Sequence, residues 1–111
     1  MIGSDFLTRR EKIYRILVEA EKPLTAEEIA KILGLSGREV NSIHTDLEHV
    51  MRSVRKRSGN SEIVEMIPAR CLTCGYTFRD REKVKRPSKC PKCNSERIEG
   101  PWFYIRKKGR K

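Results

Sequence analysis

The four cysteines of the chain form two pairs with the same short spacing. Two residues separate Cys71 from Cys74, two separate Cys90 from Cys93, and fifteen residues lie between the pairs. This pattern is typical of a structural zinc site, because each pair folds into a tight knuckle that offers two sulfurs to one tetrahedral ion. We therefore predict a zinc ribbon in which all four cysteines hold one structural Zn²⁺ per chain.

Other uses of paired cysteines fit this sequence less well. Two disulfides would need an oxidising compartment, yet the N-terminus carries no apolar signal segment. A thioredoxin-like redox site expects one such pair at a strand-to-helix junction, and no βαβ pattern surrounds either pair here. Iron is the serious alternative, because both pairs look like rubredoxin knuckles and four thiolates accept either metal. We favour zinc, since an electron carrier has no need of the helical motif described next.

Three motifs of the form Ser/Thr-x-x-Glu predict where helices begin. They lie at residues 8–11, 25–28 and 36–39, and each can satisfy free N–H groups in the first turn of a helix. Gly34 ends the second helix just before the third begins, so the two form a helix-turn-helix. Apolar residues at helical spacing predict the buried faces: Ile13, Ile16, Leu17 and Ala20; Ile29, Ile32 and Leu33; Val40, Ile43, Leu47, Val50, Met51 and Val54.

The third helix also has an outward face without acidic residues. A recognition helix needs hydrogen-bond donors and small polar groups where it meets base edges, and this face supplies them, although any solvated helix surface is also polar. His44 falls on the apolar side, where we expect a partly buried, hydrogen-bonded histidine rather than a ligand. The predicted DNA-contacting residues are Arg38, Asn41, Ser42, Thr45, His49, Arg52 and Lys56.

Two segments predict strands that flank the cysteine pairs. Residues 62–67 read as a strand stopped by Pro68, and residues 102–105 as a second strand after a turn at 100–101, with 96–99 as a further short candidate. Neither long strand is stable alone, so we predict that they pair and that the ribbon replaces the tip of the wing between them. Within the ribbon we find three candidate core residues besides cysteine: Phe78, Val84 and Ile98.

The formal net charge of +10 is unevenly distributed along the chain. Residues 1–68 hold eleven Lys or Arg against eleven Asp or Glu, whereas residues 69–111 hold fourteen against four. Such an excess indicates a polyanionic partner, although basic surface also serves solubility. We find no apolar run long enough to span a membrane, and we expect a soluble, cytoplasmic protein that acts on no membrane.

These patterns together predict an α+β fold, a three-helix winged helix-turn-helix with a zinc ribbon inserted at the wing. We assign residues 1–68 with the return strand 101–106 to the winged helix-turn-helix, residues 69–100 to the zinc ribbon, and residues 107–111 to a basic, disordered tail. A closed four-cysteine zinc offers no open position to a substrate, so we expect neither an enzyme nor a small-molecule substrate.

Three stretches carry a family likeness: residues 47–50 (Leu-Glu-His-Val) with Ser53, 68–71 (Pro-Ala-Arg-Cys) and 87–93 (Pro-Ser-Lys-Cys-Pro-Lys-Cys). With these stretches, the order of elements resembles a family of small, mostly archaeal, predicted transcriptional regulators that fuse a winged helix-turn-helix to a rubredoxin-like zinc ribbon. This resemblance implies a regulator that binds double-stranded DNA. The alternative is an adaptor that docks on a protein of the transcription apparatus through its ribbon and binds little or no DNA, and electron transfer is a third possibility.

Overall fold

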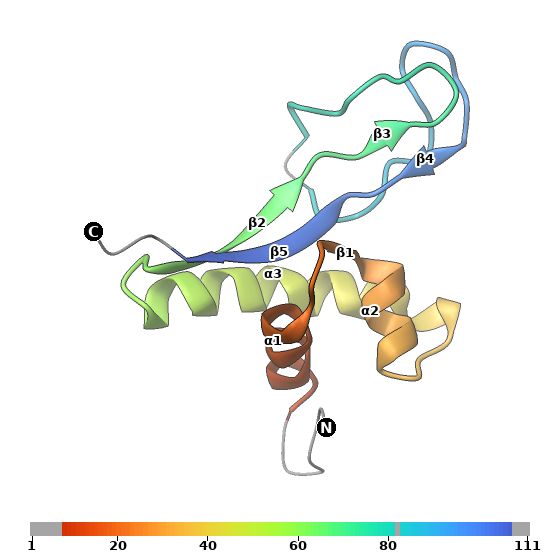
Figure 1. Cartoon of the computed structure of the whole chain (residues 1–111). Coiled ribbons are helices and arrows are strands. Elements are labelled where there is room, and N and C mark those ends of the chain that lie inside the picture. The colour runs from red at the N-terminus through yellow and green to blue at the C-terminus, as the bar shows by residue number, and fades with distance from the viewer. Residues whose placement is uncertain (1–7, 82, 108–111) are drawn as a thin grey trace.

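The protein is a small α+β molecule with three helices, two antiparallel sheets and a loop-rich part that carries the four cysteines, here called the ribbon (Figure 1). The computed structural model describes residues 8–81 and 83–107. In chain order its elements are α1 (Arg9–Glu19), β1 (Leu24–Thr25), α2 (Ala26–Ile32), the 3-10 turn η1 (Gly37–Glu39), α3 (Val40–Arg57), β2 (Glu62–Ile67), β3 (Arg70–Cys71), β4 (Ile98–Glu99) and β5 (Trp102–Lys107).

The first two predicted helix starts are confirmed. The Thr8 hydroxyl accepts a hydrogen bond from the Glu11 backbone N–H, and the Glu11 carboxylate accepts one from the Thr8 backbone N–H. Thr25 and Glu28 form the same reciprocal pair at the start of α2. The third motif, residues 36–39, opens η1 instead, and α3 proper begins at Val40.

The three helices and the sheet share one apolar core. Its fully buried side chains come from every layer, among them Ile13 of α1, Ile29 of α2, Ile43 of α3 and Phe103 of β5. One sequence prediction is wrong here, because Ile32 is 51% exposed at the end of α2. The short side chains Ala26 and Ala30 are buried instead, so α2 can approach the core closely.

Asp46 of α3 is buried, which the sequence analysis did not foresee. Only 6% of its surface is exposed. Two arginines at the start of α1 satisfy it: Arg9 donates from Nε to one carboxylate oxygen, and Arg10 Nε lies 3.0 Å from the other. The three residues therefore fix α1 against α3.

The main sheet confirms the predicted pairing of the two long strands. Its order is β1-β5-β2, all antiparallel, and β2 pairs with β5 from Glu62 opposite Lys107 to Ile67 opposite Trp102. Strand β5 is longer than the strand predicted at 102–105. Lys107, which the sequence analysis gave to the tail, is its last residue, and residues 108–111 lie outside the described part of the chain. The short strand β1 pairs with the other edge of β5.

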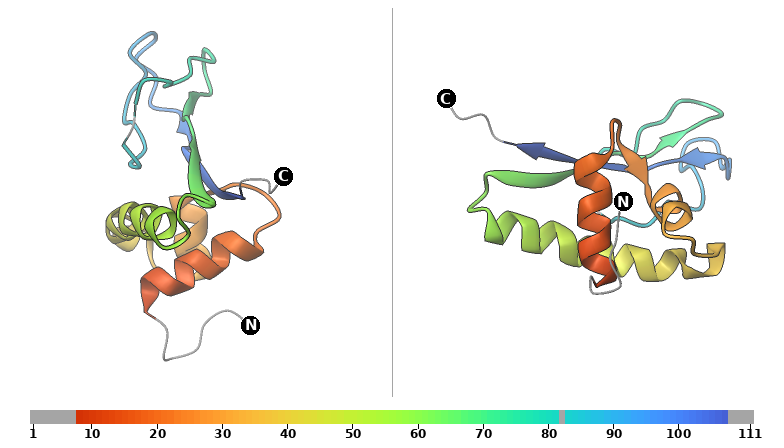
Figure 2. Two further views of the ribbon diagram at one scale, coloured as in Figure 1. Left: turned by 90° about the vertical axis from the view of Figure 1, so that its left-hand side faces the viewer. Right: turned by 60° about the horizontal axis from the view of Figure 1, so that its bottom comes forward.

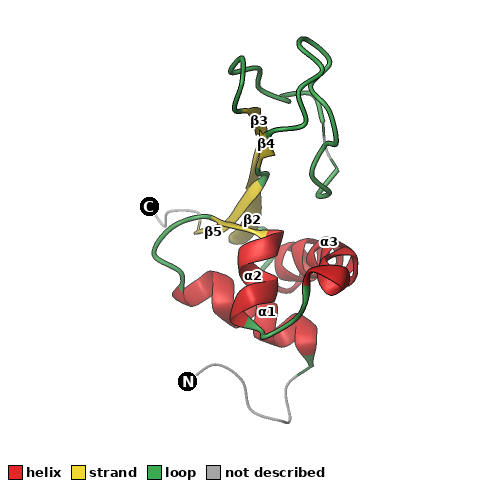
Figure 3. Cartoon of the chain, turned by 90° about the vertical axis from the view of Figure 1, so that its right-hand side faces the viewer, coloured by secondary structure: helices red, strands yellow, loops and turns green. Residues whose placement is uncertain are grey.

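The ribbon rises from the end of this sheet where β2 and β5 separate (Figures 1 and 3). Its two-stranded sheet pairs β3 with β4. Strand β4 is shorter than the strand predicted at 96–99. A second apolar cluster fills the ribbon, made of Ala69, Cys71, Phe78, Cys90 and Ile98. Val84 is not part of it: this side chain is 4% exposed and belongs to the core of the helices. Among the described residues, no helix has the length and apolar character to cross a membrane.

Candidate metal centre

The two cysteine pairs lie on knuckles with matching backbone hydrogen bonds. The Cys71 N–H donates to the Tyr76 carbonyl, and the Cys90 N–H donates to the Ser95 carbonyl, five residues on in both cases. In the return direction, the N–H groups of Gly75 and Asn94 donate to the carbonyls of Cys71 and Cys90.

Each knuckle turns at the residue after its second cysteine. Gly75 has φ +81° and Asn94 has φ +62°, both in the left-handed region, which glycine and asparagine adopt more readily than other residues. The sequence analysis did not single out Asn94 or the turn that it makes after Cys93. The signal is nevertheless visible, because both Cys-x-x-Cys pairs are followed directly by Gly or Asn. The two knuckles therefore present their sulfurs in equivalent ways.

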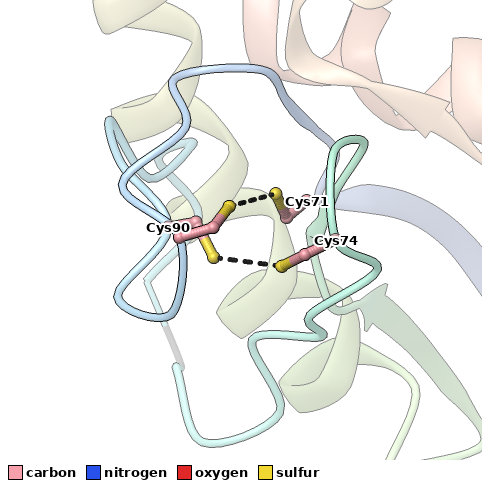
Figure 4. Close-up of side chains that lie close together, drawn as sticks. Cys71, Cys74 and Cys90 are labelled. Atoms are coloured by element: carbon pink, nitrogen blue, oxygen red, sulfur yellow. Dashed lines mark hydrogen bonds between the residues drawn. The ribbon is translucent and has the colours of Figure 1, made fainter.

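The four sulfurs converge on one point between the knuckles. All four Sγ atoms lie within 4.8 Å of one another. Cys71 Sγ is 3.6 Å from Cys93 Sγ, and Cys74 Sγ is 3.6 Å from Cys90 Sγ. Figure 4 shows the labelled side chains of Cys71, Cys74 and Cys90 pointing toward one another from their two loops.

This geometry fits a tetrahedral ion. With metal–sulfur bonds of about 2.3 Å, the sulfurs of a tetrahedron are about 3.8 Å apart, close to the separation found here. A disulfide would need about 2.05 Å, and the four cysteines are free thiols. Two of the ligands, Cys71 and Cys90, are buried, while Cys74 and Cys93 are exposed, so the centre lies at the surface of the ribbon.

Backbone amides aimed at sulfur prepare the site for a cation. The Cys74 amide, with help from that of Thr73, lowers the pKa of Cys71 to about 6, because an N–H donor favours the thiolate. In the second knuckle the Lys92 N–H lies 3.3 Å from Cys90 Sγ. A hydrogen bond of 2.8 Å between the hydroxyls of Thr73 and Ser95 joins the two knuckles. The cysteines are thus held in a ligand geometry by their own loops.

The predicted DNA-contacting residues lie elsewhere, on η1 and along α3. Their side chains are exposed except for that of His49, which is half-buried. The structure does not bring them to the sulfurs, since the knuckles sit at the far end of the ribbon (Figure 1). The predicted outward face of α3 therefore forms a second candidate site, separate from the metal centre.

A contact that the sequence analysis missed joins the ribbon to α2 and α3. Arg86 Nη1 lies 3.9 Å from Glu27 Oε2 of α2. His44 is half-buried nearby, and burial lowers its pKa. Lys85 and Arg86 act in the same direction on this pKa, while Glu27 and Glu48 oppose them. The signal that could have revealed the contact is Val84, a lone apolar residue within the charged run 79–86.

Known families and one solved structure match nearly the whole chain. The family model described as PF0610-like, N-terminal, matches residues 8–63, and that of the PF0610 rubredoxin-like zinc β-ribbon domain matches residues 68–108. The solution NMR structure of protein PF0610 from Pyrococcus furiosus is 36% identical in sequence, covers 97% of this chain and 95% of that chain, and superposes with a TM-score of 0.68. No curated protein matches this chain. With its four clustered cysteines, the C-terminal part is a rubredoxin-like zinc ribbon suited to one structural zinc ion.

Proposed function

The chain belongs to the PF0610-like family, and on that premise we propose that it is a DNA-binding transcriptional regulator whose zinc ribbon is structural. The proposal interprets α1, α2 and α3 with the sheet β1-β5-β2 as a winged helix-turn-helix. Helix α2 ends at Ile32, η1 begins at Gly37, and α3 follows directly, which is the spacing of a helix and its recognition helix.

The observation that carries the proposal is the composition of the exposed face of α3. Arg38 and Asn41 can donate to base edges, while Arg52 and Lys56 further along can reach phosphates. All four side chains are exposed. The acidic Asp46, which would repel DNA, is turned into the protein and neutralised by Arg9 and Arg10. The exposed stripe on α3 thus offers donors, with one exposed carboxylate, that of Glu48, one turn from both Thr45 and Arg52.

A salt titration of binding to mixed duplex DNA tests this function. Because each phosphate contact adds about 0.9 to the slope of log affinity against log salt, we expect binding at 50 mM salt that weakens steeply as salt rises. Arg38→Ala should change the slope by at most about one, and Asn41→Ala should relax the preference among duplexes selected from a random pool. Arg15→Ala, an exposed arginine of α1, serves as the control. A wild-type protein that does not bind duplex DNA at low salt contradicts the proposal.

A second candidate function is that of an adaptor for a protein of the transcription apparatus. Two apolar side chains near the metal favour it: Leu72 is 51% exposed within the first knuckle, and Tyr76 is 37% exposed just after it. Tyr76 packs edge-on against Phe78, with 5.0 Å between ring centroids, which holds it in place at the surface. The discriminating measurement is binding of a protein partner by the wild type and by a Leu72→Ser variant: if the ribbon is a docking module, the wild type binds the partner and little or no DNA, and the variant loses the partner.

We propose no catalytic role for either site. The four sulfurs saturate a tetrahedral ion, so no ligand position is left for water or substrate.

A further inference from the structure

The loop of the ribbon between the two knuckles returns to the helices. In two opposite side views it descends from the ribbon toward α3 (Figures 2 and 3). Val84, near its middle, is buried in the same apolar cluster as Ile43 and Leu47 of α3. The side chain of Arg86 reaches Glu27 of α2. The loop is therefore anchored to the helical part of the protein by one apolar and one charged contact.

This loop is basic. Residues 79–86 contain five Lys or Arg and two acidic residues. Lys83 and Lys85, on either side of the buried Val84, are both exposed. These two charges are therefore available at the surface, while Val84 between them is buried.

The anchored loop lies beside the first half of the α3 stripe. Lys85 and Arg86 are close enough to His44 to act on it electrostatically, and His44 lies one turn from Asn41 on α3. Two acidic residues, Glu27 and Glu48, face the same histidine and would repel phosphate. The loop places Arg86 against Glu27 and adds Lys85 nearby, so it offsets that repulsion where the stripe begins.

We propose that the loop of residues 83–86 and the exposed stripe of α3 form one surface for duplex DNA, in which Lys83 and Lys85 contact phosphates and Arg86 neutralises Glu27. This inference rests on the proposed function and adds a second contact region to it. The ribbon then serves DNA binding through its loop, while its metal holds the loop in shape. Residues 1–68, which are formally neutral, need this contribution to attract a polyanion.

The test compares two double variants that each remove two positive charges from the ribbon. Lys83→Gln with Lys85→Gln should lower the slope of log affinity against log salt by about 1.8, which is two phosphate contacts at about 0.9 each. Lys92→Gln with Arg97→Gln, exposed residues of the second knuckle away from α3, should leave the slope within about 0.5 of the wild type, since a charge outside the contact region releases no counterion. Zinc content and circular dichroism of each variant establish that the fold is intact.

The possible results separate this inference from the proposed function. A wild type that binds DNA, with equal slopes in both double variants, overturns the inference and leaves the function standing; the loop would then serve another partner, such as an acidic protein surface. A wild type that does not bind DNA overturns both. A lower slope of log affinity against log salt in the Lys83 and Lys85 variant alone, with sequence preference unchanged, supports the shared surface.

Discussion

Ile67, the last residue of β2, lies directly opposite Trp102, the first residue of β5. The chain therefore leaves the main sheet and re-enters it at the same rung, and the whole ribbon occupies the place of a hairpin loop. Closing a loop of this length costs conformational entropy, which must be offset by order within the loop itself. The ribbon has a small apolar cluster, in which two of the five side chains are metal ligands. Its folding should consequently depend on the metal.

Cys74→Ser should unfold the ribbon and leave the helices folded. The apparent binding free energy of a structural zinc is about 10–16 kcal/mol in zinc-finger peptides, far more than the ribbon's apolar cluster can supply. NMR spectra should lose dispersed signals from Phe78 and Ile98 while those of Ile13 and Ile29 remain dispersed. Ser88→Ala, a change at an exposed residue outside the ligand set, is the control. A ribbon that stays folded without metal contradicts the structural role.

Elemental analysis of the wild type should give one zinc per chain and a colourless protein. Four thiolates at this spacing also accept iron, which would give a red, reducible centre. Protein produced with both metals in the medium therefore tests the metal identity directly. A stable iron centre under those conditions would favour electron transfer over the zinc assignment.

Val84→Ala should destabilise the helical part of the protein, although residue 84 belongs to the ribbon. Removing two buried carbon atoms costs about 2 kcal/mol when transfer and cavity terms are combined. Urea unfolding followed by helical circular dichroism measures the change. Val18→Ala, which alters the same kind of residue at an exposed position of α1, should cost less than about 0.5 kcal/mol. Equal effects of the two changes would mean that the loop is not anchored.

Asp46→Asn should weaken the packing of α1 on α3. The substitution removes the negative charge that accepts hydrogen bonds from Arg9 and Arg10, and such charge-assisted bonds contribute about 1.5–3 kcal/mol. We expect a loss in the free energy of unfolding within that range. Glu48→Gln, two residues further along α3 and exposed, is the matched control and should change stability little. An unchanged free energy of unfolding in Asp46→Asn would contradict a stabilising role for the contacts of Arg9 and Arg10 with this carboxylate.

Local patterns predicted much of this fold because their interactions are local. The capping motifs at Thr8 and Thr25, the apolar spacing of α3 and the two cysteine pairs each depend on residues a few positions apart, and each is found as predicted. The pairing of β2 with β5 followed from the instability of two lone apolar strands. The metal ligands could also be predicted from the sequence, because the two cysteines of each pair are only three positions apart.

What the sequence did not reveal depends on distant partners. Asp46 looks like any other helix-surface acid until Arg9 and Arg10 are brought to it from α1. Val84 looks like a ribbon core residue until the loop folds back on the helices. Ile32 has the spacing of a buried residue, but it is 51% exposed, while Ile29 and Ala30 in the same last turn of α2 face the core. In each case the outcome was set by which element lies opposite, not by the periodicity of the segment.

Acidification should loosen the junction between the ribbon loop and the helices through His44. Burial lowers the pKa of this histidine below its ordinary value of 6.5; Lys85 and Arg86 from the loop add to the effect, and Glu27 of α2 and Glu48 of α3 oppose it. A base whose pKa is lower in the folded state binds more protons when unfolded, so stability falls as pH drops below about 6.5 and continues to fall until the folded pKa is reached.

We therefore expect the wild type to lose more unfolding free energy between pH 7.5 and 5.5 than a His44→Gln variant, with urea unfolding as the measurement. His49→Gln, which removes the other histidine of the chain, should follow the wild type. If His44→Gln loses as much stability as the wild type over this interval, the junction is not sensitive to the protonation of His44.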